Sequence, residues 1–540
     1  METAEILEVD VTPRSEARES PEQSELAASS LARILFLAVD AGDKDLILEW
    51  VREGILPTFR SLLETSAWGR TQNPVGFFVG AVWPSFWTGL SPEKHGRYCF
   101  SQLRTGTYDH YDVNPTDTRG EPFWEALSAS GCRVAILDVP KTVPSSRING
   151  IQVVDWGTHD PEMDFCTSPE SLASEIQARF GPHPVDTCDA FMQRGPAEHA
   201  ALRDALVTGV RRKADFATHF LERGGWDLFL TVFAESHCVG HHCWHLHDPK
   251  HPRHDPDAAR LVGDPIRDVY VAIDAALGRL IESAGPETTV FVLASHGMGP
   301  HYDGTFLLDK ILRRLFAEPG VPPAKRRLAR LAESAWHGLP AVLQRALRPL
   351  RKRVKDGLGE AVTVPDLDGT YCFSTPNNDV YGGIRINLAG REPQGRIHPG
   401  PEYEAFCESL SSDLLAFVNL DTGQPLVKRV LRTADLYSGE HVRDLPDLLV
   451  EWDREAPISR IHSPKTGVIE QVFPGRRTGD HKPEGLLFAR GPGIVPRRLG
   501  QPVEVTQLAP TIASLLGVRL PKTDAEPVAE LTASRPRAAP

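Results

Sequence analysis

The chain has 540 residues, of which 41% are hydrophobic and 24% are charged, as in ordinary globular proteins. This length allows one large core with a substantial insertion, or two to three smaller domains. The formal net charge of -13 argues against a nucleic-acid-binding protein, since such proteins carry a basic excess. It does not argue against small anionic substrates, because a bound metal cation can outweigh the charge of a negative protein.

The N-terminal residues 1–30 are acidic and polar, and they are predicted to form a disordered arm without a signal-peptide pattern. No apolar run approaches the ~20 residues that a membrane-spanning helix needs, so no transmembrane segment is predicted. The cysteines are scattered and form no C-x-x-C pair, which favours reduced thiols. These features predict a cytoplasmic protein.

The first core element is a short apolar run at residues 34–40 (ILFLAVD), which ends in Asp40. A buried parallel strand has this pattern, and its carboxyl end brings a functional group to the ligand crevice of an open α/β sheet. A segment with helical spacing follows at residues 44–57. Further strand patterns, with helical patterns between several of them, occur at residues 132–140, 226–236, 288–299 and 447–453.

This order of elements predicts an α/β fold with a doubly wound, mostly parallel sheet flanked by helices. Residues 31–309 would form the first part of the core with its cap segments, and residues 361–520 the second part. Between them, residues 310–360 are basic and amphipathic, which predicts a helical insertion over the mouth of the site. A membrane-surface or partner-docking helix pair is the alternative. Residues 521–540 are predicted to form a flexible tail.

Histidines gather where chemistry is expected. His237 and His241 are four residues apart, directly after the predicted strand 226–236, so on a helix they would face the same way and reach one metal ion. His296 lies at the end of the strand within the pattern at residues 288–299, and His481 lies in TGDHKPEG. With Asp40 they predict a site for one or two metal ions. Imidazole and carboxylate ligands suit zinc, manganese or iron, and argue against calcium or magnesium as the sole ion.

Six segments follow one another between residues 34 and 518: LFLAVDAGDKDLILEWVREGILPTFRSLLE, WPSFWTGLSPEKHGRYCF, SHGMG, YGGIRINLAGREPQG, GDHKPEGLLFARGPGI and QLAPTIASLLGV. In order and spacing they resemble the alkaline phosphatase superfamily, in its phosphodiesterase and nucleotide pyrophosphatase branch. The resemblance implies an alkaline phosphatase-like fold with two metal sites flanking a phosphate. Asp40 and His296 would hold the metal beside the nucleophile, and His481 would join residues 237 and 241 around the other.

Three positions depart from this pattern. Ser295 and His237 stand where the family has Asp, and Val79 stands where it has a Thr, Ser or Cys nucleophile. Valine cannot attack phosphorus, so these departures favour metal-activated water, which a zinc ion with three neutral histidines can supply. Glu235 is a candidate to orient that water or to act as its base. Ser85 is a candidate replacement nucleophile.

The predicted function is therefore metal-dependent hydrolysis of small phosphate esters, either diesters or monoesters, or a related phosphoryl transfer on an anionic substrate. Trp83 is a candidate contact for an apolar leaving group, whereas Arg391 and Glu392 are interpreted as a structural ion pair without chemistry. Ser295 and Val79 also fit a family member that has lost hydrolysis and binds a ligand or a partner. A three-histidine site equally fits a different metal-dependent biosynthetic reaction.

Overall fold

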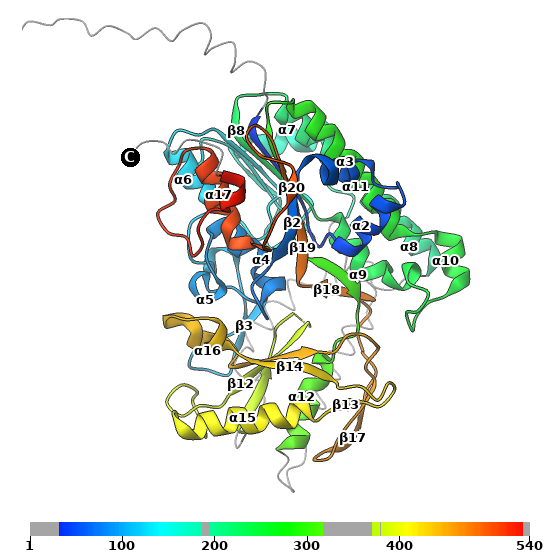
Figure 1. The fold of residues 1–540 in the computed structure, drawn as a ribbon, viewed down its shortest axis with the longest axis vertical. Helices are drawn as coiled ribbons and strands as arrows, with labels where there is room; N and C mark the ends of the chain where they lie inside the picture. The colour runs from blue at the N-terminus through cyan, green and yellow to red at the C-terminus, as the bar shows by residue number, and fades with distance from the viewer. Residues whose placement is uncertain (1–31, 186–194, 317–369, 379, 533–540) are drawn as a thin grey trace, which may run out of the picture.

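Strand β1 (Ala32–Val39) lies in the middle of a large sheet because its side chains are apolar on both faces, and Ile34 to Val39 are all buried. The computed structural model describes residues 32–185, 195–316, 370–378 and 380–532 (Figure 1). The sheet has ten strands in the order β20-β2-β19-β9-β1-β8-β5-β6-β7, with β21 beside β2. The other strands are β2 (Ala67–Gln72), β5 (Val134–Leu137), β6 (Gly150–Val154), β7 (Cys166–Ser168), β8 (Trp226–Phe233), β9 (Thr289–Ala294), β19 (Glu484–Arg490), β20 (Arg497–Arg498) and β21 (Val503–Glu504).

The centre of this sheet is parallel, as predicted. Strands β9, β1, β8, β5 and β6 all run in one direction, so their carboxyl ends meet at one edge. Towards the margins the sheet is mixed, because β19 is antiparallel to both β9 and β2, and β7 is antiparallel to β6. The predicted α/β class with flanking helices is thereby confirmed.

Helices cover both faces of the large sheet, and each face has its own apolar core (Figure 1). One face packs against α2 (Lys44–Arg52), α3 (Pro57–Thr65), α7 (Ser171–Phe180), α8 (Pro196–Leu221), α9 (Glu235–His247), α10 (Pro256–Val262) and α11 (Pro265–Ala284). The other packs against α4 (Phe78–Thr88), α6 (Phe123–Ala129), α17 (Leu508–Leu515) and α18 (Ala529–Thr532). Within the segment predicted as a flexible tail, α18 buries Leu531 in this second core.

A smaller antiparallel sheet forms a second lobe, in the lower half of Figure 1. The predicted strand at residues 447–453 belongs to this sheet and not to the large one, because a short apolar run does not specify which strands it pairs with. The strand order is β11-β12-β15-β14. The lobe contains β11 (Cys372–Thr375), β12 (Tyr381–Ile386), β14 (Val427–Arg432), β15 (Leu448–Trp452), α12 (Thr305–Leu315) and α15 (Pro401–Leu415), with the strands β13 (Val418–Asn419), β16 (Arg460–Ser463) and β17 (Gly467–Glu470) beside them.

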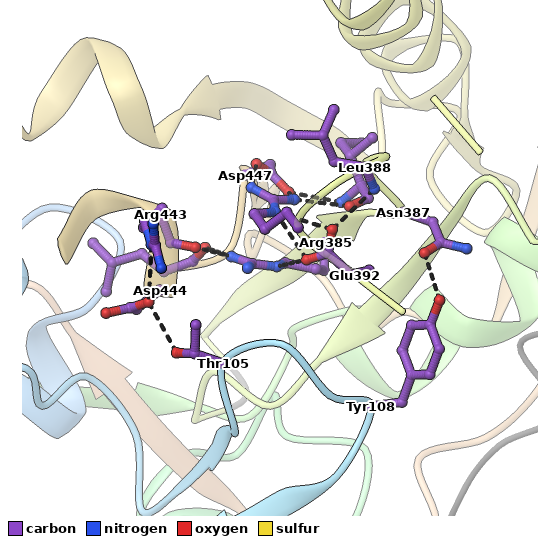
Figure 2. Close-up of polar contacts among 12 residues, drawn as sticks. Thr105, Tyr108, Arg385, Asn387, Leu388, Glu392, Arg443, Asp444 and Asp447 are labelled. Carbon is purple, nitrogen blue, oxygen red and sulfur yellow. Dashed lines mark hydrogen bonds and ion pairs between the residues drawn. The ribbon is translucent and has the colours of Figure 1, made fainter. Parts of the chain in front are cut away.

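A buried ion network holds this small sheet together (Figure 2). Arg391 donates from both terminal nitrogens to Asp447, at 2.7 Å each, and its Nε lies 2.8 Å from Glu392 Oε1. Arg385 donates to the same Glu392 oxygen at 2.7 Å. The interpretation of Arg391 and Glu392 as a structural ion pair is confirmed, with two additional members.

The hairpin of β3 (Ser101–Leu103) and β4 (His110–Asp112) reaches from the large lobe to the small one (Figure 2). Tyr108 donates to Asn387 Oδ1 at 2.7 Å, and Thr105 donates to Asp444 Oδ1 at 2.9 Å. These contacts connect the two lobes.

Two sequence predictions fall outside the described residues: the arm at residues 1–30, and most of the basic insertion at residues 310–360, where only α12 and Phe316 are described. Among the helices that are described, none has the length and apolar character needed to cross a membrane.

Candidate metal centre

The carboxyl ends of three neighbouring parallel strands, β1, β8 and β9, bring the predicted ligands together. Asp40 follows β1, His296 follows β9, and α9 begins two residues after β8. Ser236, in the first turn of α9, donates from Oγ to the Asp40 carbonyl at 2.6 Å and so fixes the helix to β1. His481 arrives on the ribbon formed by β10 (Gly297–Pro300) and β18 (Gly479–Lys482), where it pairs with Met298.

The two α9 histidines face each other across a short distance. His237 Nδ1 lies 2.7 Å from Asp40 Oδ2, and His241 Nδ1 lies 2.8 Å from the Gly479 carbonyl, so both Nδ1 atoms are hydrogen-bond donors. Each Nε2 atom therefore carries a lone pair, yet the two Nε2 atoms are only 3.1 Å apart. Two lone pairs at this separation repel each other unless a proton or a cation lies between them.

A second close pair completes the cluster. His296 Nε2 lies 3.1 Å from His481 Nδ1, and His296 Nδ1 lies 3.0 Å from Ser295 Oγ. The Ser295 hydroxyl in turn lies 3.3 Å from Asp40 Oδ1 and accepts a hydrogen bond from the Ala41 amide at 3.2 Å. Ser295 thus orients the His296 ring, so that Nε2 points into the cluster.

Asp40 is buried, and both of its oxygens accept hydrogen bonds. Trp83 donates to Oδ1 at 2.8 Å, and His237 donates to Oδ2. Burial acts to raise the pKa of the Asp40 carboxyl, but the charge and hydrogen bond of His237, with smaller contributions from His296 and Trp83, hold that pKa well below its usual range. Trp83 is 2% exposed and packs in the core, with its Nε1 on Asp40; its contact with a leaving group stays a prediction.

The imidazoles of His241, His296 and His481 are neutral at physiological pH. Burial is the main cause: it lowers the pKa of His296 to about 4, and with neighbouring charges it lowers the pKa of His241 and of His481 well below the usual value. Neutral imidazole is the form that binds metals.

Close backbone contact between α9 and β18 places His241 next to His481. A Cβ atom at Gly479 would lie 2.2 Å from the Gly240 carbonyl oxygen, so only glycine permits this approach. Thr478 N also donates to the His241 carbonyl at 2.7 Å.

Two further residues join the cluster. His159, on the loop after β6, stacks on His237 with ring centroids 3.8 Å apart, and its ligand atom lies within 4.8 Å of those of His237 and His241. Asp480 brings a carboxylate within the same distance of His241 and His481. For Asp480, the position next to His481 was a signal in the sequence; for His159, on a loop after a strand that was not predicted, there was no such signal.

Glu235, predicted beside the reacting water, lies in a different polar group. It is 1% exposed, its Oε1 is 3.2 Å from His183 Nε2 and 4.0 Å from Lys213 Nζ, and Lys213 pairs with Asp138 Oδ2 at 2.7 Å. Burial acts to raise the pKa of Glu235, but Lys213 and His183 bring it below its usual value. Asp138 also accepts from the Trp156 amide at 2.8 Å, so this group holds both the start of α9 and the loop that carries His159.

The donor set fits a metal. Five imidazoles and two carboxylates converge in the interior. The Nε2 lone pairs of His237 and His241 face each other, as they would if both nitrogens bound one cation.

Residues 34–464 match the family model described as type I phosphodiesterase / nucleotide pyrophosphatase. The chain belongs to this family. Among curated proteins, none matches this chain significantly in sequence. Among solved structures, phosphonoacetate hydrolase from Sinorhizobium meliloti 1021 in complex with phosphonoformate has 12% identity and a TM-score of 0.46, and the alignment covers 90% of this chain and 96% of that one. Human ectonucleotide pyrophosphatase / phosphodiesterase 5 has 12% identity and a TM-score of 0.46, with 93% and 99% covered.

Within this phosphodiesterase-family chain, α4 carries the position expected for the nucleophile. Val79 lies in the first turn of α4 and packs against an apolar group that contains Phe77 and Phe78. The ring of Phe78 meets His296 edge-on, with centroids 5.8 Å apart. The start of α4 therefore faces the cluster with apolar side chains.

Ser85, the candidate replacement, is fully buried in α4, with its Oγ 3.0 Å from His95 Nε2. Because His95 Nδ1 accepts a hydrogen bond from the Arg97 amide at 3.2 Å, the ring proton is on Nε2. His95 therefore donates to Ser85 and cannot take its proton.

Proposed function

We propose that this protein hydrolyses small phosphate esters, diesters or monoesters, with one or two divalent transition-metal ions, zinc first and manganese or iron as alternatives. Asp40, His237, His241, His296 and His481 would hold them, with His159 and Asp480 as additional ligands. The observation that carries the proposal is the facing pair of Nε2 atoms of His237 and His241, 3.1 Å apart, in a chain of the phosphodiesterase family.

Metal ions bound there would polarise the phosphoryl oxygens and stabilise the entering and leaving oxygens. The chain's own residues prepare the site. Asp40 holds the proton of His237 on Nδ1 and directs Nε2 inwards, and Ser295 does the same for His296. Lys141 and Arg477 add positive charge that acts on the imidazoles, which favours an anionic substrate.

A water molecule, and not a side chain, is the attacking group in this proposal. Val79 has no nucleophilic atom, and Ser85 accepts a hydrogen bond from His95, which therefore cannot act as a base on the Ser85 hydroxyl. For Glu235 we propose a positioning role, because its partners are His183 and Lys213. Through them it would fix the start of α9 and thus the two α9 histidines.

The test is hydrolysis of an aryl phosphodiester, with aryl monoester, phosphonate and sulfate ester substrates for comparison. We expect phosphodiester hydrolysis that a chelator abolishes and that zinc or manganese restores. A protein loaded with metal that turns over none of the phosphate esters would contradict the proposal.

The second candidate is a family member that no longer hydrolyses esters. Val79 and Ser295 favour it, since both replace residues that the family uses in chemistry. Such a protein would bind a phosphate ester at equilibrium without turnover, or carry out a different metal-dependent reaction. Calorimetric binding of a phosphate ester to metal-loaded protein, with the ligand recovered intact, distinguishes binding from hydrolysis.

A further inference from the structure

We propose that His301, Asp303 and Asp480 bind a further divalent transition-metal ion, beside the histidine cluster and sharing Asp480 with it. His301 and Asp303 directly follow β10, and Asp480 lies opposite Gly299 on β18. The ribbon thus turns His481 towards the first cluster and brings Asp480 to a second one. No part of the proposed hydrolysis uses His301 or Asp303.

The three side chains converge in the interior. His301 Nδ1 lies 3.0 Å from Asp303 Oδ2, and His301 Nε2 lies 3.8 Å from Asp480 Oδ2. One ligand atom from each residue lies within 4.8 Å of the other two. The exposed fractions are 8% for His301, 2% for Asp303 and 3% for Asp480. The separations are those of atoms that share one ion with bonds of about 2 Å.

Asp480 supplies an independent observation. Its Oδ1 accepts from the His481 amide at 2.8 Å, whereas Oδ2 is buried and accepts no hydrogen bond from any residue that the structure describes. That oxygen points towards His301. A buried carboxylate oxygen without a donor is unfavourable, and a cation at this position would satisfy it.

The neighbouring cation does not fill this role. Arg454, on the loop after β15, donates from Nη1 to the His481 carbonyl at 2.5 Å and lies 3.5 Å from the Pro300 carbonyl through Nη2. The hydrogen bonds that Arg454 makes therefore go to backbone oxygens, and its Nε has no partner among the described residues. Its charge acts on Asp480 and Asp303, but it donates no hydrogen bond to Asp480 Oδ2. Phe473 stacks on the His301 ring at 3.9 Å and closes the other side of the group.

The ligand chemistry indicates the class of ion. One imidazole and two carboxylates suit zinc, manganese or ferrous iron better than calcium or magnesium, and the two carboxylates balance a divalent charge. The ion would hold the turn after β10 against β18. Because Asp480 also lies within 4.8 Å of His241 and His481, its carboxylate stands between the two groups.

Anomalous diffraction from crystals of the full chain, grown with zinc or with manganese, tests the site directly. We expect a peak among His301, Asp303 and Asp480 in addition to the peak between His237 and His241. Metal filling the histidine cluster with no peak at the second group would overturn the proposal. It would instead indicate that neighbouring charges such as Arg454 balance the two carboxylates without a metal ion. Neither result depends on whether the protein hydrolyses an ester.

Metal counting by mass spectrometry provides the second measurement. Asp303→Asn keeps the shape of the side chain and should lose one metal equivalent per chain, whereas the matched control Asp309→Asn, at an exposed position of α12, should lose none. His241→Ala should keep the anomalous peak at His301. An unchanged metal count in folded Asp303→Asn would contradict the site; if that variant does not fold, the map of the unaltered protein decides.

Discussion

At the scale of single residues, the chemistry depends on which nitrogen of each imidazole carries the proton. Asp40 and the Gly479 carbonyl accept hydrogen bonds from the Nδ1–H groups of His237 and His241, which leaves the two Nε2 lone pairs facing each other. A carboxylate or carbonyl behind a ligand histidine sets its tautomer and orientation in many metal sites. Here the same arrangement is present on both rings of one helix.

His241→Ala removes one of the two facing nitrogens. We expect loss of the metal shared with His237, and a fall in aryl phosphodiester hydrolysis of roughly a hundredfold or more, since disturbing even the partners of ligands costs 10–100-fold. Metal content and initial rates check this. The matched control is His247→Ala, on the same helix but paired with Asp264 at 2.8 Å, which should keep its metal. Full metal content in His241→Ala would refute the ligand assignment.

Ser85→Ala tests whether a side chain attacks phosphorus. Since His95 donates to Ser85, we expect hydrolysis within about twofold of the unaltered protein, but a stability lower by about 1–3 kcal/mol because the His95 Nε2–H loses its buried partner. Initial rates and chemical denaturation measure the two effects separately. A loss of turnover in a stably folded, metal-loaded Ser85→Ala protein would restore Ser85 as the nucleophile.

At the scale of elements, the packing of α9 on the β10–β18 ribbon brings His241 and His481 together. Two glycines lie at this interface. A Cβ at Gly479 would meet the Gly240 carbonyl oxygen at 2.2 Å, whereas the three atoms nearest to a Cβ at Gly240 all belong to the Met298 side chain, with its terminal Cε at 2.7 Å. A backbone atom cannot move aside for the added Cβ, whereas the end of a flexible side chain can.

Gly479→Ala should therefore push β18 away from α9. We expect metal affinity to fall at least about tenfold, because a ligand displaced by ~1 Å no longer meets the ion. Gly240→Ala, at the same interface, should bind metal nearly as well as the unaltered protein. Zinc titration of both variants compares them, and equal affinities would show that this contact does not position the ligands.

At the scale of the whole molecule, the candidate ligands come from five separate segments, which include residues as distant as Asp40 and His481. An ion that binds this arrangement binds the folded chain and not the unfolded one. Bound metal should thus connect the strand ends of the large sheet with the ribbon beside the smaller lobe.

Metal removal should consequently lower stability. At a free metal concentration a hundred times the Kd, binding contributes about 2.7 kcal/mol to the free energy of unfolding. We expect chelator-treated protein to unfold at a lower temperature, and added zinc to restore the midpoint. Differential scanning calorimetry measures this, with His241→Ala as the variant whose midpoint should respond least. An identical midpoint with and without metal would argue against a site built from these segments.

Much of the large lobe could be predicted from local patterns. Buried parallel strands are short apolar runs, so residues 34–40 and 288–299 were recognisable, and the carboxyl ends of such strands meet at one edge. The spacing of His237 and His241 placed both on one helix face. The second, antiparallel sheet was not predicted, because an apolar run such as residues 447–453 carries no information about its partners.

The sequence by itself determined that Asp40, His296 and the α9 pair would stand at strand ends, since helix and strand periodicity are local properties of the chain. Only the tertiary structure decided that His159 and Asp480 join them, that Ser85 faces His95, and that Glu235 turns to Lys213. These outcomes depend on contacts between segments far apart in the chain, which side-chain packing selects and no local pattern encodes.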